Sequence, residues 1–301
     1  PPAGHKLKGD AAWRGWCFKI SQSGQFIPWS CGLRSPNGLG FNPAGDLFVT
    51  ENQGEYFGAC VLHHVTQGAF HGHPNGLFWD KPAPADPFAV PMEELAERRK
   101  APAVYFPYGV MGQSASQPLW DTTNGKFGPF AGQMFVGDQT ISTLMRVSLE
   151  KVDGQYQGAC FPFRVGFQCG NNRLVFAPDG TLLVGQTDRG WGATGGKPFG
   201  LQRVVWTGEM PFEIQNVRLT RSGFDLIFTK AVDASIASRP ETYSLQYYHY
   251  HYHRTYGSPQ VGITPATIGQ ATVCADGKTV SVGVPDLKAN EIYEFNLPGL
   301  K

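Results

Sequence analysis

The chain has 301 residues, 41% of them hydrophobic and 13% aromatic, so it can bury a sizeable core and is not a disordered protein. Its 25 Lys and Arg residues nearly balance 24 Asp and Glu residues, and a net charge of +1 gives no electrostatic basis for binding nucleic acid or an anionic membrane. The 38 glycines and 23 prolines follow no three-residue period, which excludes collagen, and no apolar run approaches the ~18 residues of a membrane span. A turn-rich, mostly β protein is expected.

Four of the six cysteines have spacings that suit disulfide bonds. Cys17 and Cys31 flank residues 18–30, which read as a hairpin, and Cys160 and Cys169 enclose a short loop-like segment. These spacings predict the disulfides Cys17–Cys31 and Cys160–Cys169, and with them an exported protein. The alternative is that all are buried free thiols in a reducing compartment. No CxxC or CxxCH motif occurs, so neither a zinc knuckle nor a covalently attached haem is expected.

An internal repeat is the clearest signal of architecture. Residues 39–49 and 174–184 match at six positions without a gap at an offset of 135, and residues 132–138 match 180–186 more weakly at an offset of 48. Each copy contains an apolar strand, and the two longer copies show strand, turn and strand. Blades of four-stranded β-propellers repeat at about 40–50 residues, and three such units account for the larger offset. A β-propeller is therefore the predicted fold.

The helical signal is concentrated in residues 91–100, where a proline is followed by early acidic and late basic residues. This pattern predicts one short surface helix inside a proline-rich insertion. Beyond Trp206 the pattern changes to short strands separated by turns, expected at 217–220, 224–228, 242–252, 271–273, 280–282 and 292–295. Their spacing predicts a small β-sandwich.

Two domains are therefore expected, with propeller blades over 1–209 and a β-sandwich-like domain over 210–301. The first 206 residues hold between four and five blade lengths, and the first blade begins partway through. Since a propeller must close to hide its sheet edges, we expect blades that this chain lacks to come from a second polypeptide or from a precursor.

Three segments resemble a known family. They are residues 32–39 (GLRSPNGL) with 50–54 (TENQG), residues 68–74 (GAFHGHP), and residues 170–192, which run from GNNR to GWG. Together they resemble the glucose/sorbosone dehydrogenase-type β-propellers, which include the soluble quinoprotein glucose dehydrogenases. The run 248–259 is similar to the β-domain of a branch of that family. The resemblance covers nearly the whole chain.

In that family, an arginine-asparagine pair and a Glu-Gln-Gly stretch line pyrroloquinoline quinone and its calcium. The resemblance implies a set of cofactor-binding residues here: Arg34, Ser35 in place of the asparagine, Gln53, Arg173 and Gln186. It implies calcium ligation by three further residues: Glu51, Gly54 and Glu55. The family's catalytic histidine lies in an earlier region that this chain does not contain. Read without the family, the arginines equally suit structural ion pairs between loops.

Histidines cluster in two places. His71 and His73 alternate, would share one face of a strand, and are the candidate catalytic residues as proton carriers or metal ligands. His249, His251 and His253 alternate with tyrosines, which permits a three-histidine metal site but is also typical of a half-exposed strand.

Three functions are compatible with these patterns. The first is oxidation of a sugar or alcohol by a quinoprotein-like dehydrogenase, an oxidoreductase acting on CH-OH groups. The second is carbohydrate binding or a scaffold role without catalysis, and the third is a polysaccharide lyase or hydrolase on the same fold. Trp191, Trp120 and Trp79 could stack on sugar or pack between blades.

Several other classes have no support in the sequence. No GxxxxGK[ST] or GxSxG motif occurs, so no nucleotide and no serine-hydrolase chemistry is expected. Neither a nucleic acid nor a membrane is expected as a partner, and the partners expected are a sugar or polysaccharide and the second polypeptide. A periplasmic or extracellular location is expected, although residues 1–5 do not read as a signal peptide.

Overall fold

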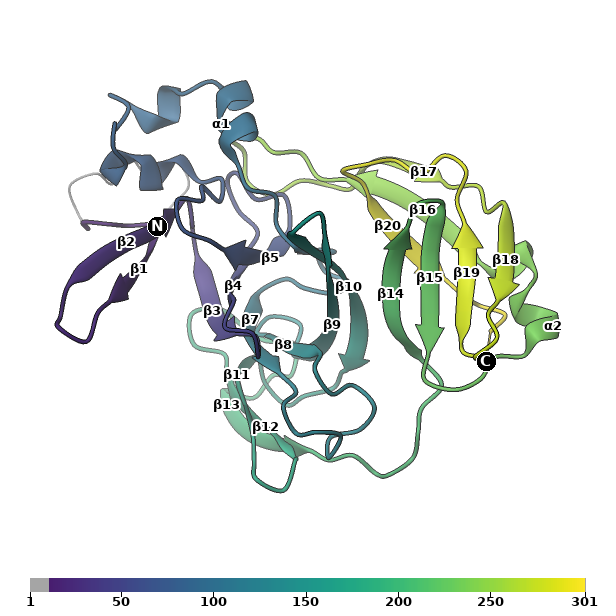
Figure 1. Cartoon of the computed structure of the whole chain (residues 1–301). Helices are drawn as coiled ribbons and strands as arrows, with labels where there is room; N and C mark the ends of the chain where they lie inside the picture. Colours follow the sequence, from purple (N-terminus) through teal and green to yellow (C-terminus); the bar gives the residue numbers. More distant parts are fainter. Residues whose placement is uncertain (1–10, 301) are drawn as a thin grey trace.

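The structure, a computed structural model, describes residues 11–300, and nearly all of its regular structure is β-strand (Figure 1). The predicted all-β class is confirmed. In this described part, no helix combines the length and the apolar character needed to cross a membrane.

Three consecutive antiparallel sheets follow a two-stranded hairpin. Their strand orders are β3-β4-β5-β6, β7-β8-β9-β10 and β11-β12-β13, so every strand pairs with the next one along the chain, as in a propeller blade. The hairpin consists of β1 (Trp16–Ile20) and β2 (Phe26–Cys31). The first sheet consists of β3 (Pro36–Phe41), β4 (Leu47–Glu51), β5 (Cys60–Val65) and β6 (Val104–Phe106). The second consists of β7 (Ala115–Trp120), β8 (Met134–Asp138), β9 (Thr143–Val152) and β10 (Gln155–Arg164). The third consists of β11 (Asn171–Phe176), β12 (Leu182–Thr187) and β13 (Phe199–Val204).

The cores of these sheets lie between them, because alternate residues of each strand face opposite neighbours. Phe48 on β4 is fully buried in a cluster shared by the first and second sheets. Phe135 on β8, its equivalent in the repeat, is fully buried in a cluster shared by the second and third sheets. Leu183 on β12 is the third equivalent, and it is only half-buried. The sequence repeat is therefore a repeat of sheet-on-sheet packing.

The insertion between β5 and β6 carries the predicted helix. This helix, α1, spans Met92–Arg98, with two glutamates in its first turn and an arginine in its last turn. Only Leu95 of α1 is buried, so the prediction of a short surface helix is confirmed. Two short 3-10 helices precede it, η1 (Pro74–Trp79) and η2 (Pro87–Ala89).

Two further sheets follow β13, and Figure 1 shows them as two layers on one side of the molecule. Their strand orders are β14-β15-β19-β18 and β17-β16-β20, and one apolar cluster is shared between them. The first contains β14 (Ile214–Thr220), β15 (Gly223–Phe228), β18 (Gln270–Val273) and β19 (Thr279–Gly283). The second contains β16 (Ser244–His249), β17 (Val261–Pro265) and β20 (Ile292–Asn296). Helices α2 (Ala234–Ala237) and η3 (Pro240–Thr242) connect β15 to β16. The domain boundary near residue 210 lies in the segment between β13 and β14 and stays a prediction.

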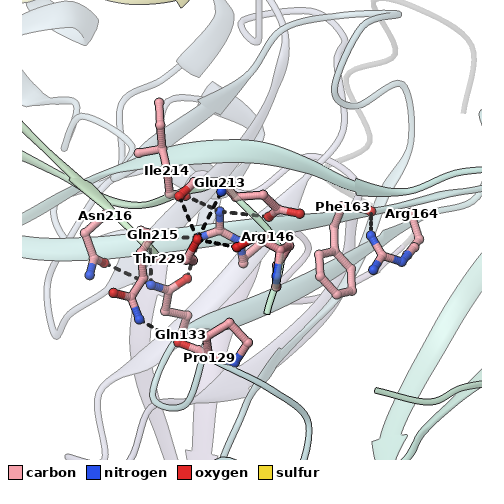
Figure 2. A network of polar contacts seen from close by, with 11 residues as sticks. Pro129, Gln133, Arg146, Phe163, Arg164, Glu213, Ile214, Gln215, Asn216 and Thr229 are labelled. Atoms are coloured by element: carbon pink, nitrogen blue, oxygen red, sulfur yellow. Dashed lines mark hydrogen bonds and ion pairs between the residues drawn. The ribbon is translucent and has the colours of Figure 1, made fainter. Parts of the chain in front are cut away.

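A buried arginine joins the second sheet to β14. Arg146 on β9 donates 2.6–2.8 Å hydrogen bonds to the side-chain oxygen of Gln133 and to the carbonyl oxygens of Ile214 and Gln215 (Figure 2). Its guanidinium also lies 4.1 Å from each of the ring centres of Phe130 and Phe161. Burial lowers the pKa of Arg146 to about 10, so the group remains charged and its charge is met by carbonyl dipoles. The Arg146 side chain therefore links the second sheet to β14 through hydrogen bonds.

The two predicted disulfides are wrong, because all six cysteines are free. The hairpin forms as expected, but Cys17 is paired with Ser30 and Cys31 with Trp16. Since adjacent positions of a strand face opposite sides, the two thiols pack into different apolar clusters. Cys160 lies within β10 and packs on the first core cluster, whereas Cys169 lies in the loop before β11. Spacing alone does not bring either pair together.

Candidate functional site

The predicted cofactor-binding and calcium-binding residues lie at or near one end of the three sheets. In each sheet, the loop that precedes the first strand and the loop that joins the second and third strands meet at this end, because the strands alternate in direction. We call this end the loop rim, and it consists of six loops: residues 32–35, 52–59, 107–114, 139–142, 165–170 and 188–198.

Two buried carboxylates hold the rim loops in place. Glu51 at the end of β4 accepts hydrogen bonds from the backbone N–H groups of Arg34 and Ser35 at 2.7 and 2.6 Å. Asp138, its repeat equivalent on β8, accepts from the N–H groups of Gln113 and Ser114, both at 2.7 Å. Burial raises the pKa of Glu51 to about 7 and also raises that of Asp138. The oxygens of Glu51 are therefore occupied by loop N–H groups.

Arg34 forms an ion pair with a residue that was expected to bind calcium. Its Nε and Nη2 atoms both lie 2.7 Å from Oε2 of Glu55. The guanidinium packs directly on Gly54, where a Cβ atom would lie 2.2 Å from Cζ, and it is 5.3 Å from the ring centre of Tyr256. Arg34 thus forms a structural ion pair between two loops, which was the alternative to a cofactor-binding role.

A C-terminal segment occupies the loop that was expected to bind calcium. The carbonyl oxygen of Gly54 accepts hydrogen bonds from the N–H groups of Phe57 and Gly257, both at 3.0 Å. Gln53 donates from Nε2 to the carbonyl of Gly58 at 3.0 Å, and Gly257 packs on its side chain. Across residues 11–300, no group of three or more His, Cys, Asp or Glu side chains is placed to hold a metal ion. Glu51, Gly54 and Glu55 therefore do not fit a calcium site in this arrangement.

The remaining predicted residues lie in the third sheet. Gln186 is buried and donates from Nε2 to the side-chain oxygens of Asn171 and Gln202, both at 2.9 Å. Arg173 is exposed and donates to the carbonyl of Asn172 at 2.8 Å. Arg34 and Gln53 are in contact in the first sheet, at the same end of the sheets as Arg173. Convergence of all three on one pocket stays a prediction.

The predicted quinone-binding side chains already have protein partners. The donors of Arg34, Gln53 and Gln186 are directed at Glu55, the carbonyl of Gly58 and Asn171 respectively. A quinone carboxylate would have to displace these partners, at the cost of the hydrogen bonds made now. The residues present therefore do not form a ready quinone site, and no chemical step is derived through that cofactor.

His73 has a structural position. Its Nδ1 accepts a hydrogen bond from the N–H of Asn75 at 3.3 Å and so caps η1. Burial lowers the pKa of His73 to about 3, with Arg34 adding to the effect. A group that is uncharged down to such a low pH and is engaged in a cap is a poor proton carrier. The candidate catalytic role of His73 therefore finds no support in this geometry.

His71 lies beside a histidine to which no separate role was given. His71 and His63 are both buried, and their ring centres are 4.6 Å apart. They face a small pocket beside α1, together with Arg99 and Tyr105. This pair is the most unusual polar feature near the loop rim.

The three C-terminal histidines follow one another along the chain, with ring centres 5.6 and 5.9 Å apart and ring planes inclined at 71° and 58°. β16 ends at His249, so His251 and His253 follow the strand instead of lying on it. His249 lies 3.3 Å from Glu291, and His253 Nε2 lies 2.7 Å from the carbonyl of Gly257. These partners indicate separate local roles.

Sequence reasoning missed three residues of this region. Asp138 could have been found from the repeat, since it lies at the offset of 48 from Gln186. Tyr256 and Arg99 carry no local signal. Tyr256 reaches the site because its segment folds onto the loop after β4, and Arg99 because the end of α1 pairs with Phe70 in the segment after β5.

No protein-family model and no curated protein sequence matches this chain. Among solved structures, it is similar to an oxidoreductase (glucose dehydrogenase) from Thermus thermophilus, with 20% identity over 62% of this chain and 49% of that one, at a TM-score of 0.40. It is also similar to the PQQ-bound aldose sugar dehydrogenase of Streptomyces coelicolor, with 16% identity over 64% and 52% of the two chains, at a TM-score of 0.41. A third similar structure is a glucose dehydrogenase with 21% identity, 62% and 49% coverage and a TM-score of 0.40.

These three proteins are described as glucose or aldose sugar dehydrogenases. This chain spans about half the length of each of them.

Proposed function

We propose that the loop rim binds a carbohydrate, within a propeller of the sugar dehydrogenase type. The observation that carries the proposal is a set of exposed aromatic rings: Tyr108 and Trp191 on rim loops are 41% and 48% exposed, and Tyr256, which pairs with Glu55 of the rim, is 60% exposed. A ring exposed beside polar side chains suits a sugar, whose apolar C–H face stacks on the ring while its hydroxyls form hydrogen bonds.

Polar groups hold two of these rings. Trp191 donates from Nε1 to Oγ1 of Thr140 at 3.0 Å, which leaves the face of its indole free. Tyr256 lies over the Arg34 guanidinium, whose charge is balanced by Glu55. Trp120, by contrast, is buried in the first core cluster and serves packing. The rim thus offers rings together with fixed hydrogen-bonding groups.

Oxidation of the bound sugar is the second candidate function. It is favoured by the contact between Arg34, Gln53 and Glu55, which are residues that the sequence resemblance assigns to the cofactor and its calcium. Because the cofactor set is not ready in this arrangement, this activity would require Arg34 to be released from Glu55 and further groups from beyond these residues. A periplasmic or extracellular location stays a prediction.

Carbohydrate binding is tested with a glycan array, followed by calorimetric titration of the best sugar. We expect Trp191→Ala and Tyr256→Ala each to weaken binding about 3- to 10-fold, since stacking contributes about 0.5–1.5 kcal/mol. Phe18→Ala is the matched control, because Phe18 is 49% exposed on the β1–β2 hairpin and not on the rim. Absence of any glycan binding, or equal losses in all three variants, would reject the proposal.

The second candidate is tested separately by dye reduction with pyrroloquinoline quinone, calcium and an aldose. Glu55→Gln removes the charge that neutralises Arg34, so it should bind the quinone more tightly than the wild type does. If neither protein binds the quinone by absorbance titration, oxidation by this chain is rejected and carbohydrate binding is unaffected.

A further inference from the structure

The pocket beside the His63–His71 pair lies between β5, the end of α1 and the C-terminal run. His63 is on β5, Arg99 directly follows α1, and Tyr250 and His251 come from the segment after β16. The enclosed space is about 10 Å³, close to the minimum that holds a single water-sized group. Part of the pocket is open to solvent, so a ligand can reach it.

The two imidazoles have unusual surroundings for buried polar groups. His63 and His71 are 1% and 0% exposed, and none of their four ring nitrogens has a hydrogen-bond partner among the residues that the structure describes. Buried polar atoms in native proteins are nearly always paired with protein, water or an ion. Leaving one unpaired is unfavourable, because the atom loses its hydrogen bond to water and gains none in the protein. The nitrogens therefore indicate that something polar fills the space.

The charge around the pocket is positive. Within residues 11–300, no carboxylate lies within ion-pair distance of Arg99, whose Nη2 donates to the hydroxyl of Tyr105 at 3.3 Å. Lys100, the next residue, contacts His64 and Thr66 on the other side of β5. The pocket lining includes no Asp, Glu or Cys side chain. Burial lowers the pKa of both imidazoles, to about 3 for His71, so each presents one N–H donor and one acceptor.

We propose that this pocket is a binding site for a compact monoanion, held by the N–H groups of His63 and His71 and by the Arg99 guanidinium. One anionic atom fits the enclosed space, and either a halide or one oxygen of a small carboxylate supplies it. A divalent metal is disfavoured, because it would lie next to Arg99 with two neutral ligands and no anionic one. The site is independent of carbohydrate binding at the loop rim.

The first experiment is an NMR titration of the full chain labelled with ¹⁵N-histidine, begun in potassium sulfate and continued with sodium chloride or sodium formate at constant ionic strength. We expect saturable shifts of the His63 and His71 ring nitrogens and none at His64, which packs against Phe48 and Tyr156 on the opposite face of β5. Saturation by chloride but not formate identifies the halide, and the reverse identifies the carboxylate. No saturable shift with either salt overturns the proposal.

The second experiment measures the midpoint of thermal unfolding at increasing anion concentrations. This midpoint rises when a ligand binds only the folded state. Arg99→Gln should weaken the anion about tenfold or more, since a charged donor is lost. His64→Gln is the matched control and should respond like the wild type. An unchanged response in Arg99→Gln, or shifts of His63 and His71 produced by zinc instead of the anions, contradicts the proposal. The wild-type titration remains decisive if a variant does not fold.

Discussion

At the scale of single residues, the histidines near the loop rim are kept uncharged by burial. The pKa values of His71 and His73 fall to about 3, far below the ordinary 6.5 of the unfolded chain. The unfolded chain therefore binds protons that the folded chain does not. The contribution of these two neutral histidines to the free energy of unfolding is fully present above pH 6.5. It is lost as the pH falls from 6.5 toward 3. Glu51, whose pKa is raised to about 7, has the opposite effect on the free energy of unfolding: its contribution decreases as the pH rises from 4.5 to 7.

The pH dependence can be measured by urea unfolding between about pH 5 and 6.5. Each buried neutral histidine should contribute a slope that rises from about 0.7 kcal/mol per pH unit at pH 6.5 to about 1.4 kcal/mol per pH unit near pH 5. His71→Gln should reduce the overall slope by about that amount, because the amide does not titrate. An unaltered slope in His71→Gln would show that this imidazole is not held neutral.

The sequence resemblance located the residues of the candidate site better than it described their hydrogen-bond and ion-pair partners. It placed Arg34, Gln53 and Glu55 together, and they are in contact. It did not indicate that Glu55 would neutralise Arg34 or that the N–H of Gly257 would bind the carbonyl of Gly54. The first contact depends on side-chain conformation, and the second on a segment some 200 positions away. Local patterns contain neither kind of information.

At the scale of elements, the repeat predicted the packing of the sheets because its apolar positions face the neighbouring sheet. Phe48 and Phe135, which share a repeat position, occupy equivalent places in two clusters. The disulfide predictions failed at the same scale, because spacing sets the loop length but strand register sets which face a thiol occupies. Strand β17 was missed, since residues 261–265 contain a glycine and end on a proline, and both residue types are uncommon inside strands.

Close contact between the first strands of neighbouring sheets depends on glycine. A Cβ atom on Gly38 of β3 would lie 2.4 Å from Cα of Gln117 and 2.6 Å from its nitrogen on β7. Because these are backbone atoms, the two strands would have to separate. Gly38→Ala should therefore lower the free energy of unfolding by about 1–3 kcal/mol. Gly192→Ala, where no atom lies within 4 Å, is the control for denaturant unfolding. Equal stability of the two variants would contradict this packing.

At the scale of the whole molecule, two apolar sheet faces are exposed within residues 11–300. On β3, Leu39 and Phe41 are 60% and 61% exposed. Their repeat equivalents in the third sheet, Leu174 and Phe176, pack on the second sheet. The opposite face of the third sheet exposes Val175, Phe199 and Leu201 at 55%, 74% and 71%. Each open face thus has the apolar character that neighbouring sheets use against one another elsewhere in the chain.

These faces predict that the functional unit contains further sheets, supplied by a second polypeptide or a precursor. Such sheets could also supply the groups that sugar oxidation lacks here. The chain studied alone should associate through the same faces, since contiguous exposed apolar surface of this kind drives self-association. Size-exclusion chromatography with light scattering should therefore show species heavier than 32.9 kDa that increase with concentration.

Charge placed on an open face should suppress that association. Leu201→Glu introduces a carboxylate at the centre of the exposed strand β13, where burial against another sheet would cost its desolvation. Ile263→Glu, at a 53% exposed position on β17 in the C-terminal sheets, is the matched control and should associate like the wild type. A monodisperse 32.9 kDa species of the wild type at all concentrations would show that these faces need no cover. Equal suppression by both variants would place the contact elsewhere.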